Sequence, residues 1–208
     1  MSVGSAVRRL FGRHESVISD LYRGFFFDAD AFVGTVKRWV PTAVNILEVG
    51  CGEGAITGRL ARSYPRAAIL GIDITARLGR LCEGRTDSVR FEQTTVEELA
   101  ETHPNGFDLV VLADVLHHVP EPSRQQLLDS IRLVMAPGAS FVFKEWERNR
   151  TLIYWLGYLS DRWITGDRIR YMRRDELRRR IAKSFGRGAA IAEERISPWR
   201  NNLATLVR

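Results

Sequence analysis

Between Val44 and Lys144, short apolar runs bounded by Gly, Pro and Asp alternate with amphipathic segments. Each run suits a strand that is covered on both faces by helices, because it lacks the polar alternation of a half-exposed strand. The alternation therefore predicts βαβ units and a mostly parallel sheet. The expected strands are Asn45–Val49, Ala67–Ile72, Val89–Glu92, Phe107–Leu112 and Ser140–Lys144, with a closing pair at Ala189–Ser197 and Asn201–Val207.

Helices are expected between these strands and at both ends of the core. The N-terminal region has two apolar stripes, from Val17 to Phe25 and from Phe32 to Val40, and Pro41 ends the second. Two more helices are expected after the fifth strand, at Arg150–Ile164 and Asp175–Phe185. The helices expected inside the core are Ala55–Arg62, Ala76–Cys82, Val96–Thr102 and Pro122–Met135.

The chain of 208 residues fits a single domain with a Rossmann-like, seven-stranded, mostly parallel sheet. Residues 1–43 would form an N-terminal helical cover, and residues 44–145 the sheet core. Residues 146–187 would form a helical insertion after strand five that faces the substrate. Residues 188–208 would supply the closing strands.

Composition excludes several classes of protein. With 45% apolar and 27% charged residues, the chain is neither wholly disordered nor a fibrous rod. No run reaches the roughly 18 apolar residues of a membrane-spanning helix, and the first 15 residues do not resemble a secretory signal. Cys51 and Cys82 are too few for a disulfide framework or a four-cysteine metal site. We expect a cytoplasmic protein without a metal.

The charge is unevenly distributed along the chain. Residues 1–145 hold 16 basic and 18 acidic side chains, whereas residues 146–208 hold 15 basic and 7 acidic ones. Such a basic C-terminal part can attract nucleic acid, an acidic membrane surface or an anionic substrate. The alternative is that these arginines, such as the run Arg178–Arg180, lie on solvated helix faces.

The strongest local feature is Ile46–Ala55, an expected strand that runs into a glycine-rich turn and opens a helix. Glycines let the backbone pass close to a ligand, and the helix N-terminus offers free N–H groups. Asp73 ends the neighbouring strand, where a carboxylate can accept hydrogen bonds from both ribose hydroxyls of an adenosyl group. These features alone fit a nicotinamide dinucleotide as well, because Gly50-x-Gly52-x-x-Ala55 satisfies that fingerprint.

Two later motifs separate the candidates. The fourth strand continues through Asp114-Val-Leu-His117-His118-Val-Pro120, and Pro137-Gly138 follows 17 residues later, before the fifth strand. Together with the glycine-rich turn and Asp73, these motifs closely resemble class I S-adenosylmethionine-dependent methyltransferases of the small-molecule type. The resemblance covers about residues 44–145.

The resemblance implies S-adenosylmethionine as the cofactor and assigns residues to it. The glycine-rich turn would line the methionine and ribose moieties, Asp73 would hold the ribose hydroxyls, and Ala113 with Asp114 would lie near the methionine end. Thr95 stands where the family often has an aspartate that meets the adenine amino group. The full set of expected cofactor residues is Glu48, Gly50, Cys51, Gly52, Gly54, Asp73, Ile74, Gln93, Thr94, Thr95, Ala113, Asp114 and His118.

Methyl transfer needs alignment of the two reactants and, for a poor nucleophile, a base. His118 is the first candidate, since its position resembles that of a functional histidine in phosphoethanolamine-type methyltransferases. His117 is its neighbour, and Tyr22 would reach over the same pocket from the N-terminal helix. The alternative is that the histidine pair serves packing and hydrogen bonding.

We expect a small, hydrophobic or amphipathic methyl acceptor, with O-methylation ahead of C-methylation. The apolar segment Thr151–Leu159 would wall the acceptor pocket, lie in a homodimer interface or touch a membrane surface. The sequence argues against base methylation, because no Asn/Asp-Pro-Pro-aromatic motif is present. An RNA- or ribosome-associated methyltransferase and a non-catalytic cofactor-binding subunit are the alternatives.

Overall fold

A computed structural model describes residues 26–82, 87–149, 151–160 and 169–208. The stripe from Val17 to Phe25, with the candidate Tyr22, lies outside the described residues. So do the first 15 residues and the end of the expected helix Arg150–Ile164.

Seven strands form one sheet in the order β3-β2-β1-β4-β5-β7-β6. Strands β1 to β5 are parallel, and β7 runs antiparallel to both β5 and β6. The expectation of a seven-stranded, mostly parallel sheet is therefore confirmed. The strands are β1 Asn45–Val49, β2 Ala68–Asp73, β3 Val89–Gln93, β4 Phe107–Ala113, β5 Met135–Trp146, β6 Ala190–Arg195 and β7 Asn202–Val207.

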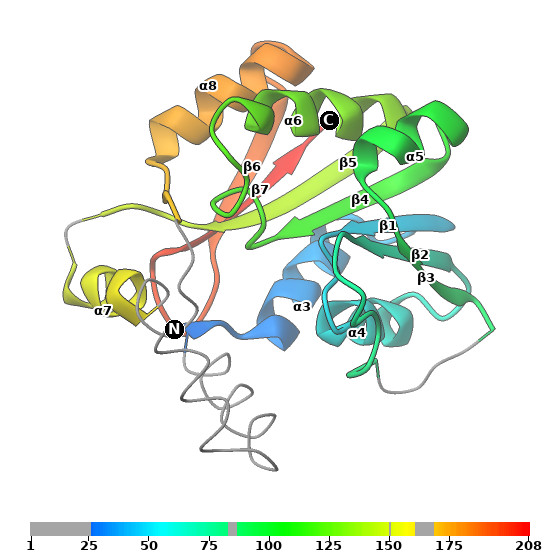
Figure 1. The fold of residues 1–208 in the computed structure, drawn as a ribbon, viewed down its shortest axis with the longest axis horizontal. Helices are drawn as coiled ribbons and strands as arrows, with labels where there is room; N and C mark the ends of the chain where they lie inside the picture. Colours follow the sequence, from blue (N-terminus) through cyan, green and yellow to red (C-terminus); the bar gives the residue numbers. More distant parts are fainter. Residues whose placement is uncertain (1–25, 83–86, 150, 161–168) are drawn as a thin grey trace.

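Helices cover both faces of the sheet (Figure 1). One face carries α3 and α4, the other carries α5, α6 and α8, and α7 lies to the side of the sheet. Their bounds are α3 Ala29–Trp39, α4 Ala55–Ser63, α5 Val96–Thr102, α6 Ser123–Val134, α7 Leu152–Ser160 and α8 Arg174–Phe185.

The two helical layers produce two apolar cores. Ile46 and Leu47 are adjacent on β1 and fully buried, yet they belong to different cores because successive strand residues point to opposite faces. Ile46 packs in the cluster with Phe32 and Leu60, and Leu47 in the cluster with Ile131. Burial on both faces explains why β1 reads as a continuous apolar run.

The helix expected at Ala76–Cys82 is wrong, because this segment forms turns. Gly79 has a φ of +65°, which a right-handed helix does not allow. The backbone N–H groups of Gly79 and Leu81 donate to the carbonyls of Gly52 and Glu53 at 3.3 and 2.7 Å. These hydrogen bonds to the glycine-rich turn replace those that a helix would have made.

Strand β5 extends beyond the expected Ser140–Lys144 at both ends. At its carboxyl end, Glu145 and Trp146 pair with Leu203 and Asn202 of β7. This pairing holds Glu145 in the sheet, where its side chain is 2% exposed. A charged residue is thus placed inside the protein next to the loop that follows β4.

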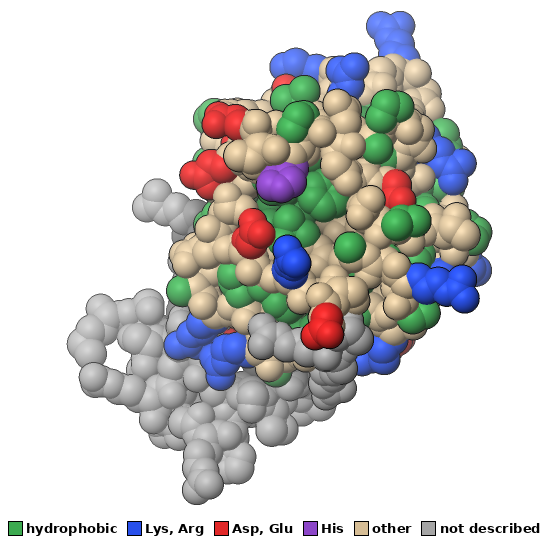
Figure 2. Space-filling model, turned by 90° about the vertical axis from the view of Figure 1, so that its right-hand side faces the viewer, with side chains coloured by type: hydrophobic (Ala, Val, Ile, Leu, Met, Phe, Trp, Pro, Cys, Tyr) green, Lys and Arg blue, Asp and Glu red, His purple; other side chains and the backbone are tan. Residues whose placement is uncertain are grey.

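Most described arginines of α8 and the segment before it form ion pairs. Arg174 and Arg178 both contact Glu193, and Arg180 contacts Glu121 and Glu176. Figure 2 shows the side of the molecule that lies away from α8, and basic and acidic side chains are interspersed there as well. Pairing of this kind favours the solvated-face interpretation of the arginine run over a nucleic-acid surface.

Helix α7 exposes most of its apolar side chains. Leu152 is 77% exposed and Trp155 54% exposed, and Leu156 and Leu159 are also exposed. No helix in the described ranges is long and apolar enough to cross a membrane.

Candidate functional site

The carboxyl ends of β1, β2 and β4 meet where the strand order reverses, between β1 and β4. In open α/β sheets this edge forms the ligand crevice, because the loops on its two sides diverge toward opposite faces. The residues expected to bind the cofactor follow these three strands and β3. The structure therefore gathers segments that are far apart in the sequence at one edge of the sheet.

The turn after β1 requires glycine at three positions. Gly50, Gly52 and Gly54 have φ values of +74°, +50° and +84°. A Cβ atom on Gly50 would lie 2.3 Å from the Val115 side chain, and one on Gly54 would lie 2.9 Å from the Gly79 backbone. At Gly52 nothing lies within 4 Å of such an atom. Gly52 is thus the place where the turn leaves space for a ligand.

Helix α4 begins directly after this turn. Its N-cap is Gly54, which has no side chain to accept a hydrogen bond, and its first turn holds no acidic residue. The N–H groups at the start of α4 therefore have no capping side chain, and the positive end of the helix dipole faces the turn.

Asp73 at the end of β2 fixes the turn from the other side. One of its carboxylate oxygens accepts a hydrogen bond from the Gly52 N–H and the other from the Thr75 N–H, both at 2.9 Å. A carboxylate offers about four acceptor sites, so two hydrogen bonds leave capacity for a ligand. The side chain is half-buried at the edge of the crevice.

Glu48 points into the protein from β1, below the turn. It is 2% exposed and accepts a hydrogen bond from the Thr57 hydroxyl at 2.5 Å. Burial raises the pKa of Glu48 to about 8, the Thr57 hydrogen bond opposes this, and the charge of Asp73 adds to it. Near neutral pH the protonated form is favoured, so Glu48 offers the crevice a hydrogen-bond donor as well as an acceptor.

Glu48 is expected to make the stability of the protein pH-dependent. Its pKa is higher in the folded chain than in the unfolded one, so its stabilising contribution is complete below pH 4.5 and is lost as pH rises through 8. In Glu48→Gln this loss is absent. Between pH 5 and 8, the free energy of unfolding measured in urea should rise in the variant relative to the native protein by up to about 1.4 kcal/mol per pH unit. A constant difference would contradict the raised pKa.

The residues expected near the adenine lie at the ends of β2 and β3. The side-chain amide of Gln93 donates to the Ile74 carbonyl at 3.1 Å, which joins the two strand ends. Thr95 is the N-cap of α5: its hydroxyl accepts from the Glu98 N–H, and the Glu98 carboxylate accepts from the Thr95 N–H and the Thr94 hydroxyl. The side chains of Thr94 and Thr95 thus stabilise the helix start. Their contact with adenine stays a prediction.

Of the expected residues, Ala113 ends β4 and pairs with Lys144 of β5, and Asp114 follows it. Asp114 adopts a φ of +56° and donates its N–H to the Lys144 carbonyl at 2.9 Å. The Lys144 ammonium lies 2.5 Å from the Asp114 carboxylate and 4.1 Å from the centre of the Phe27 ring. Because Lys144 is 1% exposed, this ion pair is partly shielded from water, and it fixes the direction of the Asp114 side chain.

The next residue of β5, Glu145, holds the following part of the same loop. Its carboxylate accepts the Leu116 N–H at 2.7 Å and contacts Nδ1 of His117 at 2.8 Å. His117 is 4% exposed and packs against Tyr171 and His118, with ring centres 4.8 and 4.2 Å away. His118 is exposed. The two histidines therefore differ: His117 belongs to a buried network, and His118 reaches the surface of the loop.

Lys144 and Glu145 were not among the residues expected at the site. The one signal in the sequence is a pair of opposite charges at the end of an apolar strand. Cys51, which was expected there, is buried at the turn, with its sulfur 3.8 Å from the Gly52 carbonyl oxygen. Burial raises the pKa of its thiol well above the usual range. Cys51 thus occupies a crowded position and is not a reactive thiolate.

Asp114, His117 and Glu145 have ligand atoms within 4.8 Å of one another, a spacing that a metal ion could use. Two interactions already satisfy these groups, since Lys144 neutralises Asp114 and His117 bonds directly to Glu145. The expectation of no metal stays a prediction.

Comparison with protein families identifies the segment that carries these features. Residues 46–138 match the family model described as a methyltransferase domain. This range contains the turn, Asp73 and the loop after β4, and the sheet order agrees with it. The chain contains a class I methyltransferase domain. The resemblance inferred from the sequence is therefore confirmed.

Relatives of the methyltransferase domain include curated and solved proteins. The chain is 37% identical over 111 residues to a ubiquinone biosynthesis O-methyltransferase from Hahella chejuensis, covering 50% of this chain and 44% of that protein. It is 34% identical over 123 residues to the Pseudomonas fluorescens protein of the same name, covering 54% and 50%. The chain thus spans about half the length of the curated relatives it matches.

A solved structure resembles nearly the whole chain. The 1,6-didemethyltoxoflavin-N1-methyltransferase of Burkholderia thailandensis, with bound 1,6-didemethyltoxoflavin and S-adenosylhomocysteine, superimposes with a TM-score of 0.71. The match covers 98% of this chain and 87% of that one at 16% identity. At this identity the likeness concerns the fold. It extends the comparison beyond the methyltransferase domain to the helices and strands at both ends.

Proposed function

We propose that this protein is an S-adenosylmethionine-dependent methyltransferase that methylates a hydroxyl group of a small hydrophobic or amphipathic molecule. The observation that carries the proposal is the hydrogen bond between Asp73 and the Gly52 N–H, which joins a carboxylate suited to ribose hydroxyls to the open position of the glycine-rich turn. The names of the curated relatives support the choice of oxygen as acceptor atom. The ion pairs of α8 argue against RNA as the substrate.

The residues present fit the cofactor. Gly52 leaves room for it, Asp73 has acceptor capacity for the ribose hydroxyls, and Glu48 is a buried carboxyl group beneath the turn. Asp114, held by Lys144, would contact the methionine end. When bound, S-adenosylmethionine supplies the activated methyl group as a sulfonium. The chain then has to align the acceptor and remove its proton.

His118 is the residue that we propose for proton removal. It is exposed on the loop after β4, four residues beyond Asp114, and an imidazole accepts a proton near neutral pH. His117 would position the loop instead, because it is buried against Glu145. Tyr22 remains a candidate for contact with the same acceptor.

Binding and turnover of S-adenosylmethionine test the proposal separately. Calorimetry should detect binding to the native chain, and Asp73→Ala should weaken it by about 1.5–3 kcal/mol, the range for hydrogen bonds to a charged group. Asp87→Ala, which removes an exposed carboxylate at the opposite edge of the sheet, is the matched control and should bind normally. Equal affinity in the Asp73 and Asp87 variants would remove Asp73 from the site.

Release of S-adenosylhomocysteine in the presence of hydroxylated aromatic acceptors then tests catalysis. Turnover that depends on the acceptor hydroxyl is expected. Binding of the cofactor without turnover of any such acceptor would favour the alternative, a non-catalytic cofactor-binding subunit.

A further inference from the structure

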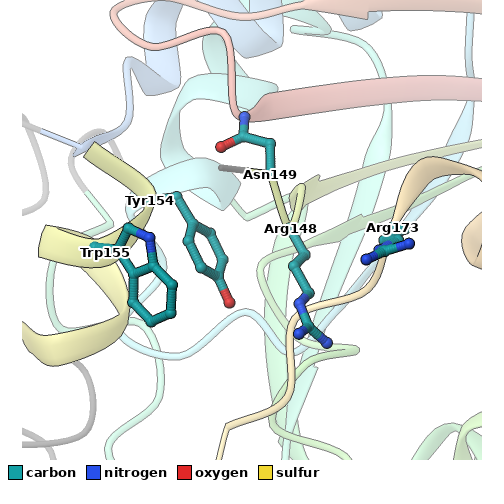
Figure 3. A pocket seen from close by; sticks show the side chains of 5 residues that line it. All are labelled: Arg148, Asn149, Tyr154, Trp155 and Arg173. Carbon is teal, nitrogen blue, oxygen red and sulfur yellow. The ribbon is translucent and has the colours of Figure 1, made fainter. Parts of the chain in front are cut away.

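A cavity of about 440 Å³ lies beside helix α7, outside the crevice of the glycine-rich turn. Tyr154 and Trp155 line it from α7, and Arg148 and Arg173 line it from the opposite side (Figure 3). The fifth lining residue, Asn149, uses its side-chain oxygen to accept hydrogen bonds from Thr151. The cavity thus presents two aromatic rings to two cationic side chains, and its volume suits a small organic molecule.

A backbone contact brings the two arginines together. The Arg148 N–H donates to the Met172 carbonyl at 2.8 Å, so the chain leaving β5 runs beside the residue before Arg173. Arg173 is also the N-cap residue of α8, and its side chain makes no capping hydrogen bond. The backbone positions of both arginines are therefore set by the end of β5 and the beginning of α8.

Within the described part of the chain, these two arginines make no ion pair, unlike their neighbours. Arg170, Arg174, Arg178, Arg179, Arg180 and Arg195 each contact a carboxylate. Arg148 lies close enough to the Tyr154 phenol to act on it: burial raises the pKa of Tyr154, and the positive charge of Arg148 opposes this. In Figure 3 the Tyr154 hydroxyl points toward the Arg148 guanidinium. Two exposed cations thus face the cavity, and no carboxylate in the described ranges pairs with either of them.

Aromatic contacts connect the cavity to the loop after β4. Tyr154 is 6% exposed and packs against Tyr171 with ring centres 5.9 Å apart, and Tyr171 packs against His117 at 4.8 Å. His117 in turn lies beside His118. The rings of Tyr154 and Tyr171 therefore form a continuous aromatic contact between the cavity and His117.

We propose that this cavity binds the anionic group of the methyl acceptor, a carboxylate or phosphate carried by an aromatic or apolar body. Guanidinium groups recognise both anions through paired N–H donors, and the faces of Tyr154 and Trp155 would contact the body. The inference rests on the proposed function and narrows its substrate class. It assigns specificity to the segment after strand five.

Binding of three matched probes tests the inference without turnover. The probes are 3,4-dihydroxybenzoate, 3,4-dihydroxyphenylphosphonate and catechol, titrated calorimetrically into the native chain in the presence of S-adenosylhomocysteine. We expect at least one anionic probe to bind more tightly than catechol and to weaken as salt is added. Which anion binds more tightly distinguishes a carboxylate from a phosphate acceptor.

Arginine variants identify the cavity. Arg148→Ala and Arg173→Ala should each weaken the anionic probe by about 10-fold or more and leave catechol unchanged. Arg179→Ala removes an exposed arginine of α8 that pairs with Asp175, so it matches the change in charge and should bind like the native chain. Equal binding of all three probes, no binding of either anion, or equal effects of all three variants would overturn the inference. Cofactor affinity, measured separately, reports on the proposed function.

Discussion

Replacing Gly52 with valine is expected to abolish binding of S-adenosylmethionine while the domain remains folded. The φ of +50° is a region that a β-branched residue rarely adopts, so the turn has to change its backbone. The valine side chain would also fill the open space above the turn. A loss of affinity of at least about 100-fold, or about 2.7 kcal/mol, should be measured by calorimetry.

Gly138 provides the matched control for this substitution. Its φ is +78°, nothing lies within 4 Å of an added Cβ atom, and it lies near the amino end of β5, away from the crevice. Gly138→Val therefore imposes a similar backbone strain without touching the site. It should lose stability by about 1–2 kcal/mol and bind the cofactor normally. Cofactor binding by Gly52→Val as tight as by Gly138→Val would mean that the turn does not approach the ligand.

The parallel core was predictable because its signals are local. The bounds of Asn45–Val49 and Val96–Thr102 agree with the expected ones, since each is an apolar or amphipathic run enclosed by turn or capping residues. The positions of Gly50 and Asp73 were also predictable, because each stands where a strand ends at the crevice. Such features can be predicted from the few residues on either side of them in the sequence.

The errors concern segments whose structure depends on distant partners. Ala76–Cys82 has the composition of a helix, but its N–H groups bond to the glycine-rich turn more than 20 residues earlier. The burial of Lys144 and Glu145 depends likewise on Asp114 and His117. A pattern of apolar spacing treats charged residues at a strand end as solvated, so it cannot find this network.

The cavity beside α7 shows the same limit for substrate recognition. In the sequence, Thr151–Leu159 is apolar on nearly all sides of the expected helix, and three interpretations stayed open. The structure gives Tyr154 and Trp155 a place beside Arg148 and Arg173 and leaves Leu152 exposed. The cavity lining supports the interpretation that this helix walls a pocket. The homodimer and membrane interpretations stay predictions for the exposed leucines.

Replacing Glu145 with alanine is expected to be among the most destabilising changes at the site. The Leu116 N–H and His117 Nδ1 would both lose their partner in a buried setting. Removing one member of a buried, hydrogen-bonded pair costs about 3–5 kcal/mol. Urea unfolding should show this loss. Glu147→Ala, which breaks a partly exposed ion pair with Arg195, is the control and should cost no more than about 1 kcal/mol.

Glu145→Gln separates stability from positioning. A glutamine keeps the shape and accepts the Leu116 N–H with its oxygen, so its amide group faces Nδ1 of His117. An amide donates where the carboxylate accepted, which forces the His117 proton onto Nε2. We expect a smaller loss of stability than for alanine, a changed tautomer in ¹⁵N NMR spectra of the His117 ring, a lower kcat and an unchanged cofactor dissociation constant. An unchanged tautomer and kcat would mean that Glu145 supports the fold of the loop and does not orient the histidine pair.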